Sequence, residues 1–276
     1  MSSVKPIVRR IGRVANRISG ERLSNIETIT NVYNRYASGQ YDFGEFEMYV
    51  PPKRLGSWND DTQEFVVEET RDAVFWDVGA NIGYFSLRSA AQAVSVRAFE
   101  PEPGNYEILR KNLELNRVEN VDSHRLAVSN ESRQTDLYRD TTEGSGINSL
   151  AYDERLDGEP STVDVEPIDS LVTEHEVPDF VKLDVEGAEL KVVEGAESLL
   201  EREAVRWLIE VHSPRTGQRV DRLGQHGGDV ESLYARLAEN GYQIYGYDDG
   251  LVEFEIDDET LPLHWYATKE SPETGR

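Results

Sequence analysis

The fold of this chain is decided by one short stretch, Val74-Phe75-Trp76-Asp77-Val78-Gly79-Ala80-Asn81-Ile82-Gly83. Its opening residues form an apolar run typical of a buried strand, and its two glycines predict a tight turn after that strand. A glycine has no Cβ, so the backbone can turn sharply and a ligand can approach the start of the next helix. The next apolar run ends at Glu100, whose two carboxylate oxygens match the two hydroxyls of a ribose. The stretch therefore predicts a nucleotide-handling site.

From residue 74 onward, short apolar runs alternate with longer amphipathic ones, which is typical of a doubly wound α/β sheet. We expect strands at 74–78, 94–99, 121–127, 180–184 and 205–211, closing strands at 242–247 and 264–268, and helices at 84–91, 106–116, 188–193 and 230–239. The section from 129 to 167 is less regular. It predicts two short strands, 135–138 and 162–166, around a polar loop at 141–146 that is suited to a lid, while 214–228 reads as a mobile insertion.

The chain carries a large excess of acid, with 53 acidic and 29 basic residues and a net charge of −24. Such a surface repels nucleic acid, so we expect no nucleic-acid partner. This acid-rich, lysine-poor composition resembles proteins of halophiles, where molar salt screens charges over about 3 Å. No cysteine is present, which excludes disulfides and thiolate metal sites. The sequence shows no signal peptide and no apolar run near the roughly 20 residues of a membrane span, so we expect a cytoplasmic protein.

The amino-terminal end breaks this charge pattern. Residues 1–20 carry five basic side chains and no acid, and their apolar residues recur at helical spacing. A basic amphipathic helix of this kind can contact an anionic membrane as a peripheral anchor, or it can pack on its own domain. We therefore divide the chain into this helix, an extension at 21–70 that packs on the core, and a main domain at 71–276.

The glycine turn differs from the dinucleotide fingerprint GxGxxG, because Gly79 and Gly83 stand four residues apart. This spacing disfavours an NAD-linked oxidoreductase, which is one alternative function. The combination of Asp77, Asn81 and Glu100 around the turn resembles instead the cofactor site of class I methyltransferases that use S-adenosylmethionine.

A second stretch narrows the resemblance to one family. The run Lys182-Leu183-Asp184-Val185-Glu186-Gly187-Ala188-Glu189, followed by Trp207 to His212, resembles the FkbM family of methyltransferases. The likeness covers roughly 72–212 and leaves out the basic amino-terminal helix. It implies the Rossmann-like fold of class I methyltransferases, a mostly parallel sheet of seven strands with one antiparallel closing strand, and S-adenosyl-L-methionine as cofactor.

The resemblance also implies roles for particular residues. The backbone around Asp77, Gly79 and Asn81 would meet the methionine part of the cofactor, Glu100 would hold the ribose, and the adenine would lie beside Ala127. Gly83, the second glycine of the turn, is also expected at the cofactor. Methyl transfer to an alcohol requires alignment of the acceptor oxygen and removal of its proton by a base. Polar residues at the carboxyl ends of later strands are the candidates for this catalytic work, and they are Asp184, Glu186, Glu210 and His212.

Among these four residues we favour His212 as the base, because a histidine titrates near neutrality. The same four side chains could instead bind a divalent cation, but their spacing does not define a coordination shell, so we expect no metal. Lys182 and Glu189 fit a structural ion pair or a helix cap. The remaining histidines, 124, 175, 226 and 264, have no comparable setting and are interpreted as structural or surface residues.

Together, these observations predict an O-methyltransferase. Its acceptor would be a hydroxyl, or alternatively a carboxylate, of a sugar, glycan or other polar metabolite. A further alternative is a non-catalytic scaffold or binding protein of a glycosylation complex, since a fold alone does not prove activity.

Overall fold

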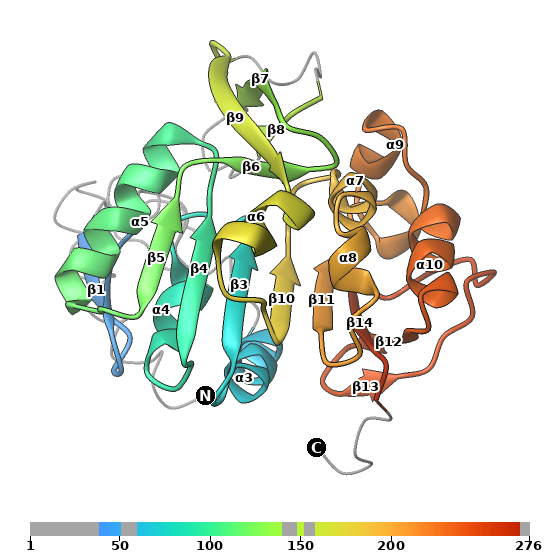
Figure 1. Cartoon of the computed structure of the whole chain (residues 1–276), viewed down its shortest axis with the longest axis horizontal. Helices are drawn as coiled ribbons and strands as arrows, with labels where there is room; N and C mark the ends of the chain where they lie inside the picture. Colours follow the sequence, from blue (N-terminus) through green and yellow to red (C-terminus); the bar gives the residue numbers. More distant parts are fainter. Residues whose placement is uncertain (1–38, 51–59, 140–147, 152–157, 271–276) are drawn as a thin grey trace, which may run out of the picture.

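The computed structural model describes residues 39–50, 60–139, 148–151 and 158–270. An eight-stranded sheet runs through the centre in the order β13-β12-β14-β11-β10-β3-β4-β5 (Figure 1). Its strands are β3 (Val74–Val78), β4 (Ser95–Phe99), β5 (Val121–His124), β10 (Phe180–Leu183), β11 (Arg206–Glu210), β12 (Gln243–Tyr247), β13 (Leu251–Val252) and β14 (His264–Thr268).

The pairing of these strands confirms the expected class I methyltransferase fold. Strands β5, β4, β3, β10 and β11 are parallel neighbours, and β14 runs antiparallel between β11 and β12. Seven strands thus follow the expected pattern, and the two-residue β13 adds a short edge. The chain builds outward from β3 to β5 and then returns to add β10 on the other side. The strand order therefore reverses between β3 and β10, where ligands bind in such sheets.

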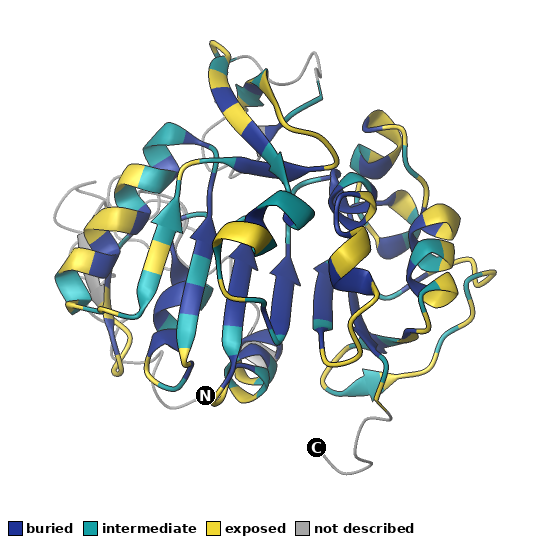
Figure 2. Ribbon diagram, in the orientation of Figure 1, coloured by how far each residue is buried: buried dark blue, intermediate teal, exposed yellow. Residues whose placement is uncertain are grey.

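Helices cover both faces of the sheet (Figure 1). One face is covered by α3 (Asp60–Glu69), α4 (Tyr84–Ala90) and α5 (Pro103–Asn116), the other by α6 (Ile168–Glu174), α7 (Glu189–Glu194), α8 (Glu197–Leu200) and α10 (Val230–Glu239). The largest apolar cluster lies on the second face, where fully buried Trp76, Trp207 and Trp265 pack under these helices. Figure 2 shows the central strands buried along almost their whole length, as a parallel sheet covered on both sides requires.

Two boundaries differ from the sequence expectation. Helix α5 begins at Pro103, three residues early, because the Glu102 side chain accepts the Asn105 N–H at 2.6 Å and proline fits the first helical turn. The single strand expected at 121–127 is divided in two. Strand β5 ends at His124, and β6 (Ala127–Ser129) joins β7 (Arg133–Arg139), β8 (Asn148–Ser149) and β9 (Ser161–Pro167) in a separate sheet above the strand ends (Figure 1).

The segment 214–228, which we interpreted as a mobile insertion, contains two short helices. It forms η1 (Pro214–Thr216) and α9 (Arg222–Gln225), and both are capped by local side chains. Ser213 and Thr216 form a reciprocal capping box, and Asp221 accepts the Gly224 N–H at 2.9 Å. These short helices could not be predicted from composition, because glycine, arginine and glutamine occur in loops as well as in short capped helices.

Two expected segments, the basic helix at 1–20 and the polar loop at 141–146, lie outside the described residues. Ahead of the sheet, β1 (Gly39–Asp42) pairs with β2 (Glu47–Val50), and the Tyr49 N–H donates to Asn112 Oδ1 on α5 at 2.6 Å. Among the described residues, none of the helices combines the length and apolar character needed to cross a bilayer.

Gly79, the first residue of the turn after β3, packs closely against the backbone at the end of β10. Its φ is +85°, and a Cβ built on it would lie 1.8 Å from the Asp184 carbonyl oxygen at the end of β10. The Asp184 N–H in turn donates to the Val78 carbonyl at 3.0 Å. The missing side chain at this position therefore lets the turn pack directly against the backbone of the neighbouring strand.

We predict that Gly79→Ala lowers the free energy of unfolding by more than about 2 kcal/mol, since the added methyl group collides with rigid backbone in a left-handed conformation. Gly217→Ala is the matched control. Its φ is +82° and no atom lies within 4 Å of the added Cβ, so we expect a loss of about 1 kcal/mol from the backbone conformation alone. Denaturant titration in molar potassium chloride measures both, and equal losses would refute the close packing of Gly79 on β10.

Candidate active site

A pocket opens at the carboxyl ends of β3, β4 and β10, where the strand order reverses. Its walls combine apolar side chains with a few polar groups, the usual character of a small-molecule site. The lining residues used below are Gly79, Asn81, Phe99, Glu100, Leu126, Ala127, Leu137, Leu150, Asp184 and Glu186.

Glu100 is the central polar group of this pocket. Its Oε2 accepts the Asn81 N–H at 2.8 Å, and its Oε1 accepts the Glu102 N–H at 2.9 Å. The residue is only 4% exposed. Burial raises the pKa of Glu100 to about 7, against the lowering effect of these hydrogen bonds. Backbone donors therefore fix the carboxylate in place. Oε2 keeps a lone pair that can accept a hydroxyl, whereas Oε1 also accepts the Asn105 side-chain amide at 3.4 Å and would share its acceptor capacity with that long bond.

The pocket fits the nucleoside part of the expected cofactor. The Glu100 oxygens can receive two ribose hydroxyls, and apolar Phe99, Leu126 and Leu137 offer surfaces for a flat base. Four of the six residues expected at the cofactor, Gly79, Asn81, Glu100 and Ala127, lie in this lining.

The other two expected cofactor residues, Asp77 and Gly83, are not among the residues that line the pocket. Asp77 is fully buried on the opposite side of the sheet, where its Oδ2 accepts the Ser86 hydroxyl of α4 at 2.6 Å. Gly83 caps the start of α4 with φ at +90°, and a Cβ there would lie 2.4 Å from Leu109. Because strand residues alternate between faces, an acid one position before the end of β3 points away from the pocket. Both residues therefore pack against α4 and α5, on the face of the sheet that these helices cover.

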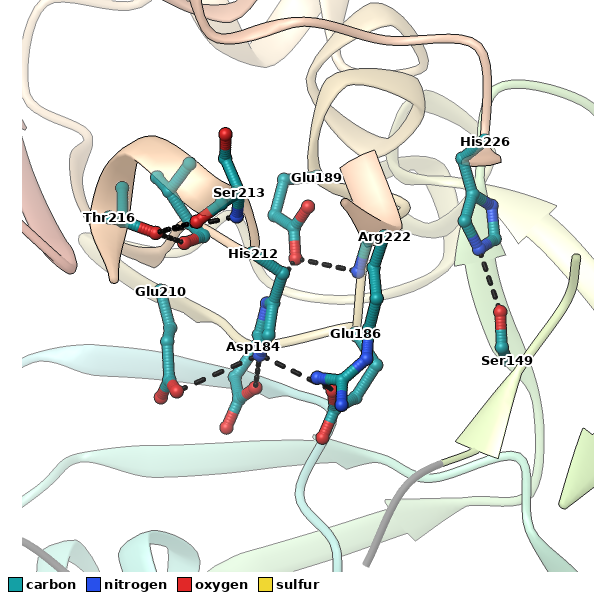
Figure 3. Close-up of polar contacts among 12 residues, drawn as sticks. Ser149, Asp184, Glu186, Glu189, Glu210, His212, Ser213, Thr216, Arg222 and His226 are labelled. Atoms are coloured by element: carbon teal, nitrogen blue, oxygen red, sulfur yellow. Dashed lines mark hydrogen bonds and ion pairs between the residues drawn. The ribbon is translucent and has the colours of Figure 1, made fainter. Parts of the chain in front are cut away.

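Beside the pocket lies a cluster of buried charges centred on His212 (Figure 3). The Nδ1 of His212 is 2.7 Å from Glu189 Oε1, on α7. Its Nε2 faces three carboxylates, Glu186 at 3.3 Å, Glu210 at 3.7 Å and Asp184 at 3.8 Å. The four side chains expected to be catalytic are therefore adjacent, and Asp184 and Glu186 also line the pocket.

His212 is held as a cation by these neighbours. Burial alone would lower its pKa, but the hydrogen bond to Glu189 and the charges of Glu189, Glu186 and Asp184 raise the pKa to about 10. An imidazolium has no lone pair for an incoming proton, so this protonation state argues against our interpretation of His212 as the base, which stays a prediction. The side chain instead balances the negative charge of the cluster and orients the carboxylates.

Glu186 and Glu210 differ from each other in their environments. Burial raises the pKa of Glu186 to about 7, although the charges of His212 and Arg222 oppose this shift. For Glu210, burial acts in the same direction, but the hydrogen bond from His264 and the charge of His212 lower its pKa to about 2. Two carboxylates whose pKa values are separated in this way can take different roles, and only Glu186 exchanges a proton near neutrality.

The sequence motif did not reveal the partners of its own residues. Lys182 pairs with Asp184, at 3.1 Å, and not with Glu189. Glu189 is fully buried and pairs with His212, while its Oε1 also accepts the Gly187 N–H at 2.9 Å. Arg222 of α9 forms an ion pair with Glu186 that the sequence analysis missed entirely. The sequence offered one signal for this ion pair, which is the presence of an arginine in the segment that follows β11.

One further contact links the small sheet to α9. Ser149 Oγ lies 2.9 Å from His226 Nε2, and both residues are buried (Figure 3). Burial lowers the pKa of His226 to about 4, so this ring is neutral where His212 is charged.

The donor set beside the pocket could also hold a metal ion, because ligand atoms of Asp184, Glu210 and His212 lie within 4.8 Å of one another. Two side-chain cations already occupy this region, however, since Lys182 and the His212 imidazolium both face Asp184. A divalent cation there would have to displace or deprotonate them.

Comparison with known proteins identifies related sequences. Residues 77–244 match the methyltransferase FkbM domain family. A hexuronic acid methyltransferase, AglP, of Haloferax volcanii is 31% identical over 159 residues, covering 56% of this chain and 63% of that protein. Methyltransferase 1 of Beauveria bassiana is 32% identical over 151 residues, covering 46% of this chain and 59% of the relative. The chain thus spans about three fifths of the length of these two curated relatives.

The solved structures include a similar chain from the same family. The crystal structure of methyltransferase FkbM from Methylobacillus flagellatus is 17% identical with a TM-score of 0.45, and the match covers 95% of this chain and 60% of that one.

We predict that the His212 ring stays protonated at about pH 8 and that Glu189→Gln lowers its pKa, because the buried counter-charge is removed. Side-chain NMR of 15N-labelled histidine measures both ring nitrogens through a pH titration. His226 gives an internal contrast, since it should remain neutral across the same range. If the wild-type His212 ring instead titrates near its ordinary value of about 6.5, the charged-cluster interpretation is wrong.

Proposed function

The chain belongs to the FkbM methyltransferase family, and we propose that it transfers a methyl group from S-adenosylmethionine to a hydroxyl oxygen of a sugar. The observation that carries this proposal is the position of Glu186, which lines the pocket and also belongs to the His212 cluster. A side chain that faces both can receive a proton from an acceptor placed beside the cofactor.

S-adenosylmethionine, when bound, supplies an electrophilic methyl group on a sulfonium. Glu100 and Asn81 would hold its ribose side, and the apolar wall around Ala127 would hold its adenine. The protein's main task is then to align the acceptor hydroxyl, because an in-line displacement depends on near-attack geometry.

We assign Glu186 as the base that receives the hydroxyl proton. Arg222 and His212 Nε2 both contact its Oε2, which fixes the carboxylate and leaves Oε1 to accept the proton. Its pKa of about 7 matches a base that works at neutral pH. A carboxylate acceptor would need no such group, so the presence of Glu186 favours a hydroxyl. As the acceptor oxygen bonds to the methyl carbon, the carbon–sulfur bond breaks and the proton moves to Glu186.

The sugar class of the acceptor is supported by the AglP relative, a hexuronic acid methyltransferase. The charges of the cluster are compatible with this class. Lys182, His212 and Arg222 lie among the carboxylates, so the site is not uniformly negative and can accommodate an anionic sugar.

We predict that S-adenosylhomocysteine binds to the protein and that Glu100→Ala weakens binding at least tenfold, because two hydroxyl acceptors are lost together. Affinity for the wild-type protein should rise between about pH 6 and pH 8, since ionised Glu100 accepts hydrogen bonds from the ribose hydroxyls and its pKa is about 7 before binding. Calorimetric titration in molar potassium chloride measures both effects. Glu107→Ala, an exposed acid on α5, is the control and should leave the affinity unchanged. Equal affinity for the Glu100 variant would remove Glu100 from the ribose site.

We also predict that Glu186→Gln lowers kcat about 100-fold or more, since the amide cannot take a proton, while the affinity for S-adenosylhomocysteine changes little. Transfer of labelled methyl groups to glucuronic acid and to short hexuronate oligosaccharides provides the assay. Glu239→Gln, at the exposed end of α10, should retain full turnover. Full activity of the Glu186 variant would contradict its assignment as base, whereas cofactor binding without transfer to any hexuronate would contradict only the proposed acceptor.

A further inference from the structure

Three side chains to which the sequence analysis gave no catalytic role come together on the sheet face that α6 covers. Asp122 and His124 alternate along β5 and so point to the same side. His175 follows the last residue of α6, 51 positions later in the chain. One potential ligand atom from each of the three lies within 4.8 Å of the other two.

We propose that Asp122, His124 and His175 bind a transition-metal dication such as Zn²⁺. Two imidazole nitrogens and one carboxylate oxygen form a three-ligand set of the kind that zinc accepts, with water completing the tetrahedron. The His124 and His175 ring centroids are 4.7 Å apart, and His124 Nε2 is 3.3 Å from Asp122 Oδ2. Within the described residues, His124 Nε2 makes no hydrogen bond of acceptable geometry, although it is shielded from solvent.

The two rings are positioned by aromatic neighbours. His124 stacks on Phe99 with centroids 5.2 Å apart and planes 23° apart, and His175 meets Trp76 edge-on at 6.4 Å. Both partners belong to the rigid centre of the sheet, so the imidazoles have little rotational freedom to lose on binding.

A route for the ion is open from solvent. Helix α6 has only seven residues, and Figure 2 shows that β5 is half-buried to exposed where the central strands are buried. The Asp122 side chain is 55% exposed, against 21% for His124. The carboxylate is therefore the most accessible ligand, and the two histidines are half-buried beside it. Arg97, 3.7 Å from Asp122 Oδ2, competes for this carboxylate and limits the affinity.

The other imidazoles of the chain have partners of their own. All five histidines lie in the described ranges, and the remaining three contact a carboxylate or a hydroxyl, His212 with Glu189, His226 with Ser149 and His264 with Glu210. Since the sequence contains no cysteine, the pair at 124 and 175 offers the strongest nitrogen donor set for a soft or borderline metal.

Metal binding here would reach the wall of the pocket. The Glu100 N–H donates to the His124 carbonyl at 3.1 Å, and Phe99, on which the His124 ring stacks, lines the pocket. An ion that joins β5 to the connection between α6 and β10 would therefore stabilise this wall without contact to the reacting groups.

Equilibrium dialysis of the full chain, without an affinity tag, against Zn²⁺ in molar potassium nitrate provides the test, since nitrate hardly complexes Zn²⁺ and leaves it available to the protein. We expect one tight equivalent per chain and an increase in melting temperature on addition of Zn²⁺. Asp122→Asn and His175→Ala should each lower the affinity at least tenfold and abolish the increase in melting temperature. Asp122 is largely exposed, so its variant keeps the fold even where the histidine variant loses it. Mg²⁺ should not compete, because it prefers oxygen ligands.

Asp184→Asn is the matched control and distinguishes this site from the cluster beside the pocket. If Asp184→Asn loses the tight equivalent while Asp122→Asn keeps it, the metal belongs to the His212 cluster and the proposal is wrong. Weak binding of several equivalents that no variant changes would indicate only the acidic surface, and it would overturn the proposal as well. Both readouts are independent of methyl transfer, so failure here leaves the proposed function untouched.

Discussion

The buried hydrogen bond between His212 Nδ1 and Glu189 Oε1 is the interaction on which the catalytic half of the site depends. It joins the end of β11 to α7 at 2.7 Å, and both side chains are almost completely removed from water. The Glu189 carboxylate stabilises the imidazolium, and the imidazolium in turn holds Asp184, Glu186 and Glu210 at one edge of the sheet. A buried ion pair of this kind adds little net stability, but loss of either partner leaves an uncompensated charge. The pair fixes the positions of the surrounding carboxylates and makes their pKa values differ from one another.

The fold brings the two halves of the site together at the point where the strand order reverses. Glu100 follows β4 on one side of β3, whereas Asp184 and Glu186 follow β10 on the other. The close approach of Gly79 to the Asp184 carbonyl sets the distance between these halves. The proposed cofactor pocket and the proposed base are therefore held by adjacent strands of one sheet. The contact between Ser149 and His226 joins the small sheet to α9.

Much of this architecture follows from the sequence, because each parallel strand is a continuous apolar run and each run ends at a polar residue. The same pattern predicts Glu100 as the ribose residue and places the later acids at one edge. The division of 121–127 into β5 and β6 was not predictable, since both parts are compatible with a strand and only the tertiary pairing separates them. The turn motif likewise did not show that the Asp77 side chain faces α4 and lies outside the lining of the pocket.

The protonation state of His212 could not be predicted from the sequence, because a pKa is set by neighbours that sequence spacing does not reveal. Glu189 stands 23 positions away and lies on another element. The central claim is thus that a carboxyl group, and not the imidazole, accepts the proton. The direct test is the temperature dependence of the apparent pKa that governs kcat, because carboxyl ionisation has almost no enthalpy whereas imidazole ionisation is strongly endothermic. The charged-cluster account predicts a limb near pH 7 that stays in place on warming, and a limb that moves to lower pH on warming would contradict it.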